Sequence, residues 1–174
     1  MAVVYFITEN YVKEMTAITQ NVDANEFNFL VKTNADMWVK GYIGSYFYDY
    51  LLAKYNAQTL NVDETYLVQE MIRPLIAWRV ASDAFFATAN QMKNKGPQTQ
   101  SGDNSQPVGQ QVTVFGMKHY QQKAEWYQNF LGAYLGDCDN HNLFPEFISE
   151  LNKHAILKPK VKNYNAFGND MLFI

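Results

Sequence analysis

Apolar residues recur every three or four positions along most of this chain, which is the spacing of one face of an α-helix. The longest such pattern begins at Asp63, a candidate N-cap residue, and carries two adjacent apolar stripes. One stripe comprises Leu67, Met71, Leu75, Trp78, Ser82, Phe85, Ala89 and Met92, and the other comprises Val68, Ile72, Ile76 and Val80. A face of this width predicts a central helix that other helices surround. Pro74 predicts a kink or break near Ile72, because proline lacks the N–H that a helix needs.

A second long helix is predicted after a polar interruption. From about Gln111, apolar residues again follow helical spacing, and they are Tyr120, Ala124, Tyr127, Leu131 and Tyr134. Gly136 is a candidate terminator of this helix. Residues 95–111, between the two patterns, are rich in Gly, Pro, Ser, Gln and Asn, and a loop of this length is uncommon inside a compact domain. We therefore expect two long antiparallel helices joined by a polar arm.

Shorter patterns predict five further elements. They are a β-prone run over residues 3–7, a helix over 9–15 capped by Thr8, a helix from Asp23 to Lys40 that Gly41 terminates, a helix from a Gly44-Ser45 N-cap to about Tyr55, and a helix from Leu143 to about Lys153 with Pro145 in its first turn. The fold class predicted is mainly α: a helical bundle with two long antiparallel helices, a long polar inter-helix arm over 95–111 and an extended C-terminal tail.

The predicted domain covers residues 1–153, and the tail covers 154–174. The tail has no helical period and ends in the apolar run Met171-Leu172-Phe173-Ile174. So little apolar surface cannot form a core of its own, and we expect the tail to dock on a neighbouring subunit or partner. The alternative is an edge strand on its own domain.

Composition narrows the classes of function. The net charge of −3 gives no basic surface for general nucleic-acid binding, and the single cysteine cannot form an internal disulfide. The chain begins without the pattern of a signal peptide, and no apolar run approaches the roughly 18 residues that a membrane span needs, so we expect a soluble, cytosolic protein without membrane contact. Aromatic residues make up 16% of the chain, which suits either subunit interfaces or a core built from large side chains.

Candidate chemistry is weak at every position inspected. His119, His141 and His154 are far apart, and Cys138 with His141 supplies too few ligands for zinc. The candidate glutamates have no characteristic spacing and are expected on solvated helix faces; they are Glu9, Glu14, Glu64, Glu70, Glu125 and Glu146. A basic cluster in the tail could contact a phosphate backbone or an acidic partner, or be merely exposed; it comprises Lys153, His154, Lys158, Lys160 and Lys162. We expect no enzyme activity, no catalytic residue, no cofactor and no metal.

Several segments, taken in order, resemble a family of bacteriophage virion proteins from crAss-like and other phages of Bacteroidetes-type hosts. The segments are 7–12, 18–23, 42–52, 72–78, 93–96, 104–107, 124–135 and 142–147. The turn before Gly44 lacks the family's usual proline, and the chain after Phe147 has no counterpart in the family. The resemblance therefore covers roughly residues 7–147.

This resemblance implies a head-to-tail connector, a mainly helical structural protein. Such proteins form a homo-oligomeric ring, usually a dodecamer, below the portal protein and above a tail or second ring protein. Packaged DNA passes through the channel without sequence-specific binding. The implied location is the neck of the virion, with assembly in the host cytoplasm.

Contacts with neighbouring subunits or partners are expected in the arm and the tail. The candidate residues are Gln98, Asn104, Pro107, Lys158, Lys160, Phe167, Leu172 and Phe173. One alternative function is a tail-completion or minor capsid protein of the same virion. The other is a small helical enzyme or ligand-binding domain, with a pocket between the two long helices and the arm as its gate.

Overall fold

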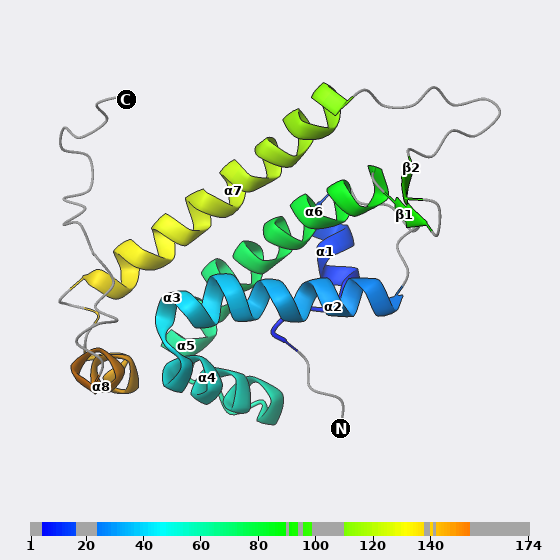
Figure 1. Ribbon diagram of the computed structural model, residues 1–174. Helices are drawn as coiled ribbons and strands as arrows, with labels where there is room; N and C mark the ends of the chain where they lie inside the picture. The colour runs from blue at the N-terminus through cyan, green and yellow to red at the C-terminus, as the bar shows by residue number, and fades with distance from the viewer. Residues whose placement is uncertain are drawn as a thin grey trace, which may run out of the picture.

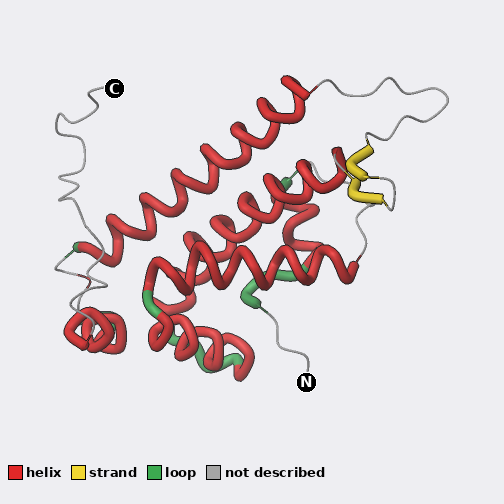
Figure 2. Tube along the Cα trace, viewed as in Figure 1, coloured by secondary structure: helices red, strands yellow, loops and turns green. Residues whose placement is uncertain are grey.

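Helices make up most of the part of the chain that the structure describes, so the predicted mainly α class is confirmed (Figures 1 and 2). The computed structural model describes residues 5–16, 24–89, 91–93, 96–98, 110–137, 140 and 142–153. Its elements in order are α1 (Glu9–Met15), α2 (Ala24–Asn34), the π-helix η1 (Ala35–Lys40), α3 (Gly41–Ile43), α4 (Ser45–Ala57), α5 (Val62–Leu67), the π-helix η2 (Val68–Ile72), α6 (Arg73–Ala89), β1 (Gln91–Lys93), β2 (Gly96–Gln98), α7 (Gln110–Gly136) and α8 (Pro145–Lys153).

The two long helices α6 and α7 pack side by side and antiparallel, as predicted (Figure 1). Near one end of the pair, the Ser82 hydroxyl donates to the backbone oxygen of Met117 over 3.4 Å. Further along the pair, the Arg79 guanidinium donates to the Gln128 side chain over 3.2 Å. Residue numbers thus rise along one helix as they fall along the other.

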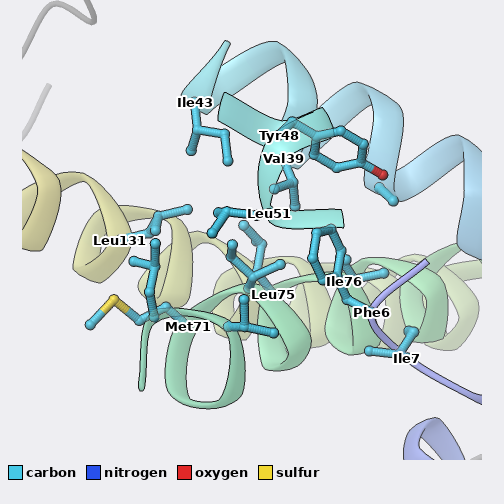
Figure 3. Packing of buried hydrophobic residues seen from close by; sticks show 14 of the residues in the cluster. Phe6, Ile7, Val39, Ile43, Tyr48, Leu51, Met71, Leu75, Ile76 and Leu131 are labelled. Carbon is cyan, nitrogen blue, oxygen red and sulfur yellow. The ribbon is translucent and has the colours of Figure 1, made fainter. Parts of the chain in front are cut away.

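Helix α6 and the π-helix before it are central to the core, as their wide apolar face predicted. Leu75 and Ile76 are completely buried, between residues from the N-terminal segment, η1, α4 and α7 (Figure 3). In Figure 3, Leu51 of α4 lies between Leu131 of α7 and Leu75 of α6. Burial of this much apolar area is the main stabilising contribution to the fold.

The first described residues are irregular, so the predicted β-prone run is wrong over residues 5–7. Phe6 has a φ of 63°, which lies in the left-handed region and cannot belong to an extended strand. This conformation buries the Phe6 ring against Tyr48 and Tyr55, at centroid distances of 5.5 and 5.4 Å. Thr8 caps α1 as predicted, since its hydroxyl accepts a hydrogen bond from the Tyr11 N–H.

Gly41 does not end the helix that precedes it, contrary to prediction. Its φ of −65° is helical, and its N–H donates to the backbone oxygen of Asp36 across the π-helix η1. The chain instead leaves helical geometry at Gly44, where φ is 88° and ψ is 151°. A residue with a side chain rarely adopts that conformation, so Gly44 permits the sharp joint between α3 and α4.

The helical run predicted to start at Asp63 starts one residue earlier and is capped by Asn61. The Asn61 side chain accepts from the Glu64 N–H, and the Glu64 carboxylate accepts from the Asn61 N–H, each over 2.8 Å. Pro74 does not break the run. The turn before it widens into η2, where the Arg73 N–H donates to Val68 five residues back.

The bounds of the predicted polar arm differ from the structure at both ends. Helix α6 ends at Ala89, and β1 pairs with β2 in an antiparallel hairpin that places Gln91 opposite Gln98. The apolar stripe that the sequence predicted as helical therefore ends before Met92, which lies in β1 instead. The second helix already begins at Gln110. Residues 99–109 and the tail over 154–174 lie outside the described part of the chain.

Helix α8 begins at Pro145, which confirms the prediction of proline in the first turn. Phe144 and Phe147 pack α8 against α4, because both rings contact Phe47 at centroid distances of 5.9 and 5.5 Å. No helix among the described residues has the length and apolarity needed to cross a bilayer.

Gly132 of α7 lies so close to Tyr42 of α3 that a Cβ atom there would overlap the tyrosine hydroxyl. We expect Gly132→Ala to lower the free energy of unfolding by about 1–2 kcal/mol, because the clash outweighs the gain in helix propensity. Denaturant titration followed by circular dichroism measures this. Tyr42→Phe should restore part of the loss, since it removes the overlapping oxygen.

Gly41→Ala is the matched control for this substitution. Its Cβ would lie 3.8 Å from the nearest atom, an ordinary contact, and φ is already helical. That variant should therefore gain up to about 1 kcal/mol. Equal effects of alanine at Gly132 and Gly41 would contradict the close contact.

Candidate functional site

Of the residues predicted to contact partners, only Gln98 lies in the described part of the chain. It pairs with Gln91 in the β1–β2 hairpin, which lies at the C-terminal end of α6 (Figure 1). The others lie outside the described residues, and their contacts remain predictions; they are Asn104, Pro107, Lys158, Lys160, Phe167, Leu172 and Phe173.

No group of three or more potential metal ligands gathers among the residues that the structure describes. His119 is exposed on α7, with its ring 6.0 Å from that of Tyr120. Cys138, His141 and His154 lie outside the described residues. The exposed surfaces of the described helices are therefore the candidate sites.

The most exposed large aromatic side chains of α7 share one face of that helix. Phe115 is 74% exposed and Trp126 is 59% exposed. At 100° per residue, their separation of eleven residues brings both to nearly the same direction, with His119 between them and Phe130 beside Trp126. The rings of Trp126 and Phe130 are 5.4 Å apart. We call Phe115, His119, Trp126 and Phe130 the aromatic stripe.

The aromatic stripe is carried on a rigid base. On the flank of α7 that meets α6, the Trp78 and Tyr120 rings stack with centroids 5.8 Å apart and planes 23° apart. The Lys123 ammonium group lies 4.1 Å from the centre of the Trp78 ring, which is cation–π geometry. Deeper in the structure, Ala124 and Leu131 are completely buried. The stripe therefore presents its rings from a helix whose opposite side is fixed in the core.

A second exposed apolar surface lies at the other end of the α6–α7 pair. Val62 is 85% exposed and Tyr66 is 45% exposed, one turn apart on α5. The Tyr66 ring contacts that of Tyr134, which in turn contacts Phe144 next to the exposed Leu143. Asp63 lies in the same turn of α5. Burial of Tyr134 raises the pKa of its hydroxyl most, and the negative charge of Asp63 raises it further. We call Val62, Asp63, Tyr66, Tyr134 and Leu143 the acidic patch.

Glu64 is the polar residue that sequence reasoning placed wrongly. It was expected on a solvated face, but it is only 3% exposed, in the joint between α4 and α5. Its carboxylate accepts from the Lys54 ammonium at 2.7 and 2.5 Å, one distance to each oxygen, and from the Tyr50 hydroxyl at 2.9 Å. Burial opposes its ionisation, but the hydrogen bonds from Lys54, the Asn61 N–H and Tyr50 hold the pKa of Glu64 below its ordinary value.

This cluster of carboxylate, ammonium and phenol has the functional groups of an acid–base site, but its partners satisfy one another. The Glu64 hydrogen bond raises the pKa of Lys54, and burial raises that of Tyr50. Each group is thus held in its resting protonation state at neutral pH. We interpret the cluster as a structural clamp between α4 and α5.

Arg79 is a second buried polar residue that the sequence did not reveal. Its guanidinium lies 3.7 Å from the centre of the Trp38 ring and donates to the Gln128 side chain over 3.2 Å. Burial lowers its pKa, although arginine remains charged at neutral pH. The side chain joins η1, α6 and α7, so it too fixes the helices rather than forming a reactive centre.

A hollow of about 410 Å³ lies at the joint of α4 and α5, lined by Tyr55, Asn56, Gln58, Leu60, Thr65 and Gln69. Its walls carry amides and hydroxyls but no charged side chain. The ligand-binding alternative placed a pocket between the two long helices, where Trp78, Tyr120 and Leu131 are packed. The hollow therefore lies away from the position that this alternative requires.

Comparison with known proteins places most of the described helices in one family. The family described as "Family of unknown function (DUF6712)" matches residues 39–155, from the end of η1 to beyond α8. No curated protein and no solved structure matches the chain. The match includes the aromatic stripe, the acidic patch and the Glu64 clamp. Since it covers more than half of the sequence, the chain belongs to the DUF6712 family.

Proposed function

We propose that this chain is a structural virion protein, a head-to-tail connector that forms a homo-oligomeric ring below the portal of a bacteriophage. Two features support the proposal: the ordered resemblance over residues 7–147, and the presence of two different exposed apolar surfaces on one subunit. The second carries the proposal furthest, because a ring needs two unlike surfaces on every copy, each facing a different neighbour.

The surface of the chain suits assembly better than catalysis. Large aromatic rings held exposed on a rigid helix mark interaction sites when they are contiguous and bordered by polar residues. The polar clusters of the described residues, around Glu64 and Arg79, are engaged in joining helices. In the proposed assembly the chain has no enzymatic step, and its twelve or so copies hold portal and tail together.

Packaged DNA would pass through the ring without base-specific contacts. The net charge of −3 favours this, because a strongly basic channel would hold the phosphate backbone and hinder its passage. The proposed location is the neck of the virion, after assembly in the host cytoplasm. A tail-completion or minor capsid protein would use the same surfaces at another position in the particle.

Mass spectrometry and cryo-electron microscopy of particles from the phage that encodes this chain test the proposal. We expect about twelve copies per particle, and density for α6 and α7 in a ring directly below the portal. Density at the tail end or in the shell would favour the alternative virion roles. Particles that lack the chain altogether would contradict any structural role in the virion.

A further inference from the structure

We propose that neighbouring copies of this chain join head to tail, with a basic aromatic patch on α7 of one copy seated on the acidic patch of the next. The basic patch comprises Val114, Phe115, Lys118 and His119, at the N-terminal end of the aromatic stripe. The inference rests on the proposed ring and specifies the contact between its subunits. The partner is therefore a second copy of this chain.

The basic patch combines an exposed apolar centre with positive charge. Val114 and Phe115 are both exposed, and Lys118 lies one turn further along, also exposed. The segment from Gln110 to Ala124 contains two lysines and one histidine but no acidic residue. Lys118 forms no ion pair with any residue that the structure describes. Its charge is thus available to a group from outside the chain.

The acidic patch has the opposite charge around a similar apolar centre. Asp63 lies beside the exposed Val62, and no basic residue occurs between positions 62 and 70. Within the described chain, Asp63 has no ion-pair partner, whereas the neighbouring Glu64 is fully engaged by Lys54. Asp137 is exposed one turn beyond Tyr134 and adds to the negative charge.

The two patches cannot meet within one chain. They lie at opposite ends of the α6–α7 pair (Figure 1). Phe115 and Tyr134 are nineteen residues apart on one straight helix, which corresponds to roughly 28 Å at 1.5 Å per residue. A contact between the patches of two copies leaves one patch free on each copy. It can therefore propagate, and it closes into a ring when the rotation between copies allows.

The charges of the two patches favour head-to-tail pairing over a symmetric pairing of like patches. Two basic patches, or two acidic patches, placed face to face would bring like charges into a partly desolvated contact, which is unfavourable. A basic patch on an acidic patch pairs Lys118 with Asp63 while Phe115 packs among Val62, Tyr66 and Leu143. Apolar burial supplies the affinity in this arrangement, and the charges select the head-to-tail pairing.

Reciprocal charge reversal in the full-length chain tests the pairing. Lys118→Glu alone, and Asp63→Lys alone, place like charges at every contact between copies. An equimolar mixture of the two variants restores an opposite pair at every contact when the variants alternate around the assembly. The matched controls are Lys32→Glu on α2 and Glu14→Lys on α1, because both residues are exposed and lie outside the two patches.

Sedimentation velocity over a range of concentrations is the measurement, with thermal unfolding of each variant as a check on folding. We expect each single variant to need about tenfold more protein to associate, the mixture to regain the behaviour of the unchanged chain, and the controls to match it. If the unchanged chain associates and the reversals have no effect, or the mixture is not restored, the pairing is wrong while the ring proposal stands.

A chain that stays monomeric at every concentration would also overturn this inference. The proposed virion role is tested by a separate measurement on phage particles. A failure of the virion role can therefore be distinguished from a failure of the patch pairing.

Discussion

Replacing Phe115 and Trp126 together by serine should leave the chain folded and prevent its self-association. Both rings are mostly exposed, so the fold loses little when they are removed. Buried in an assembly, each would act as an aromatic anchor, and truncating such an anchor costs about 2 kcal/mol or more. That corresponds to about thirtyfold in the dissociation constant for each residue, so the double variant should remain monomeric.

Size-exclusion chromatography with light scattering gives the mass of the double variant, and circular dichroism gives its helix content. Phe29→Ser with Met37→Ser is the matched control, because these side chains are similarly exposed on α2 and η1. The control should associate like the unchanged chain. An assembly that survives loss of both stripe residues, or is lost equally in the control, would argue against the aromatic stripe as the interface.

Glu64→Ala should destabilise this fold strongly, with a loss of about 3 kcal/mol of unfolding free energy. The change removes the carboxylate that binds Lys54, Tyr50 and the Asn61 N–H, and it leaves the first two groups partly buried without their partner. Asn61→Ala removes only the capping contact and should cost about 1 kcal/mol. Denaturant titration at neutral pH measures both losses.

The same clamp should make the fold sensitive to acid. The folded-state pKa of Glu64 is lower than its unfolded value, so the ionised carboxylate stabilises the fold fully above the unfolded pKa. This contribution is lost as the pH falls through the ordinary range of glutamate toward the lower folded value. Glu64→Gln keeps the shape and cannot ionise, so its stability should depend less on pH in this range. Parallel pH profiles for the two proteins would contradict the role given to this carboxylate.

The helices were predictable because their signals are local. The period of apolar residues located the core faces of α6 and α7, and the hydroxyl of Thr8 was enough to place the start of α1. The sequence also carries a signal for the aromatic stripe. Phe115 and Trp126 lie off the apolar face defined by Ala124 and Leu131, and large aromatic residues on the polar side of a helix are a signal of contact.

Other features required the packed structure because their causes lie far away in the sequence. Glycine is a residue type that often ends helices, but the helical run passes from α2 through the π-helix η1 into α3, whose first residue is Gly41, while Val39 and Ile43 pack in the core. Pro74 was expected to bend or break its helix, and the widened turn η2 accommodates it instead. At Gly41, packing in the core outweighs a helix-propensity cost of about 1 kcal/mol, whereas at Pro74 the widened turn before the proline keeps the run unbroken.

Most helices, the antiparallel pairing of the two long ones and the polar segment between them followed from residue patterns along the chain. The burial of Glu64 against Lys54, the position of Arg79 over Trp38 and the exposure of Trp126 on α7 became visible once the helices were packed. The physical reason is that periodicity shows which residues share a helix face. Which faces meet, and which remain for a partner, depends on how all the helices pack at once.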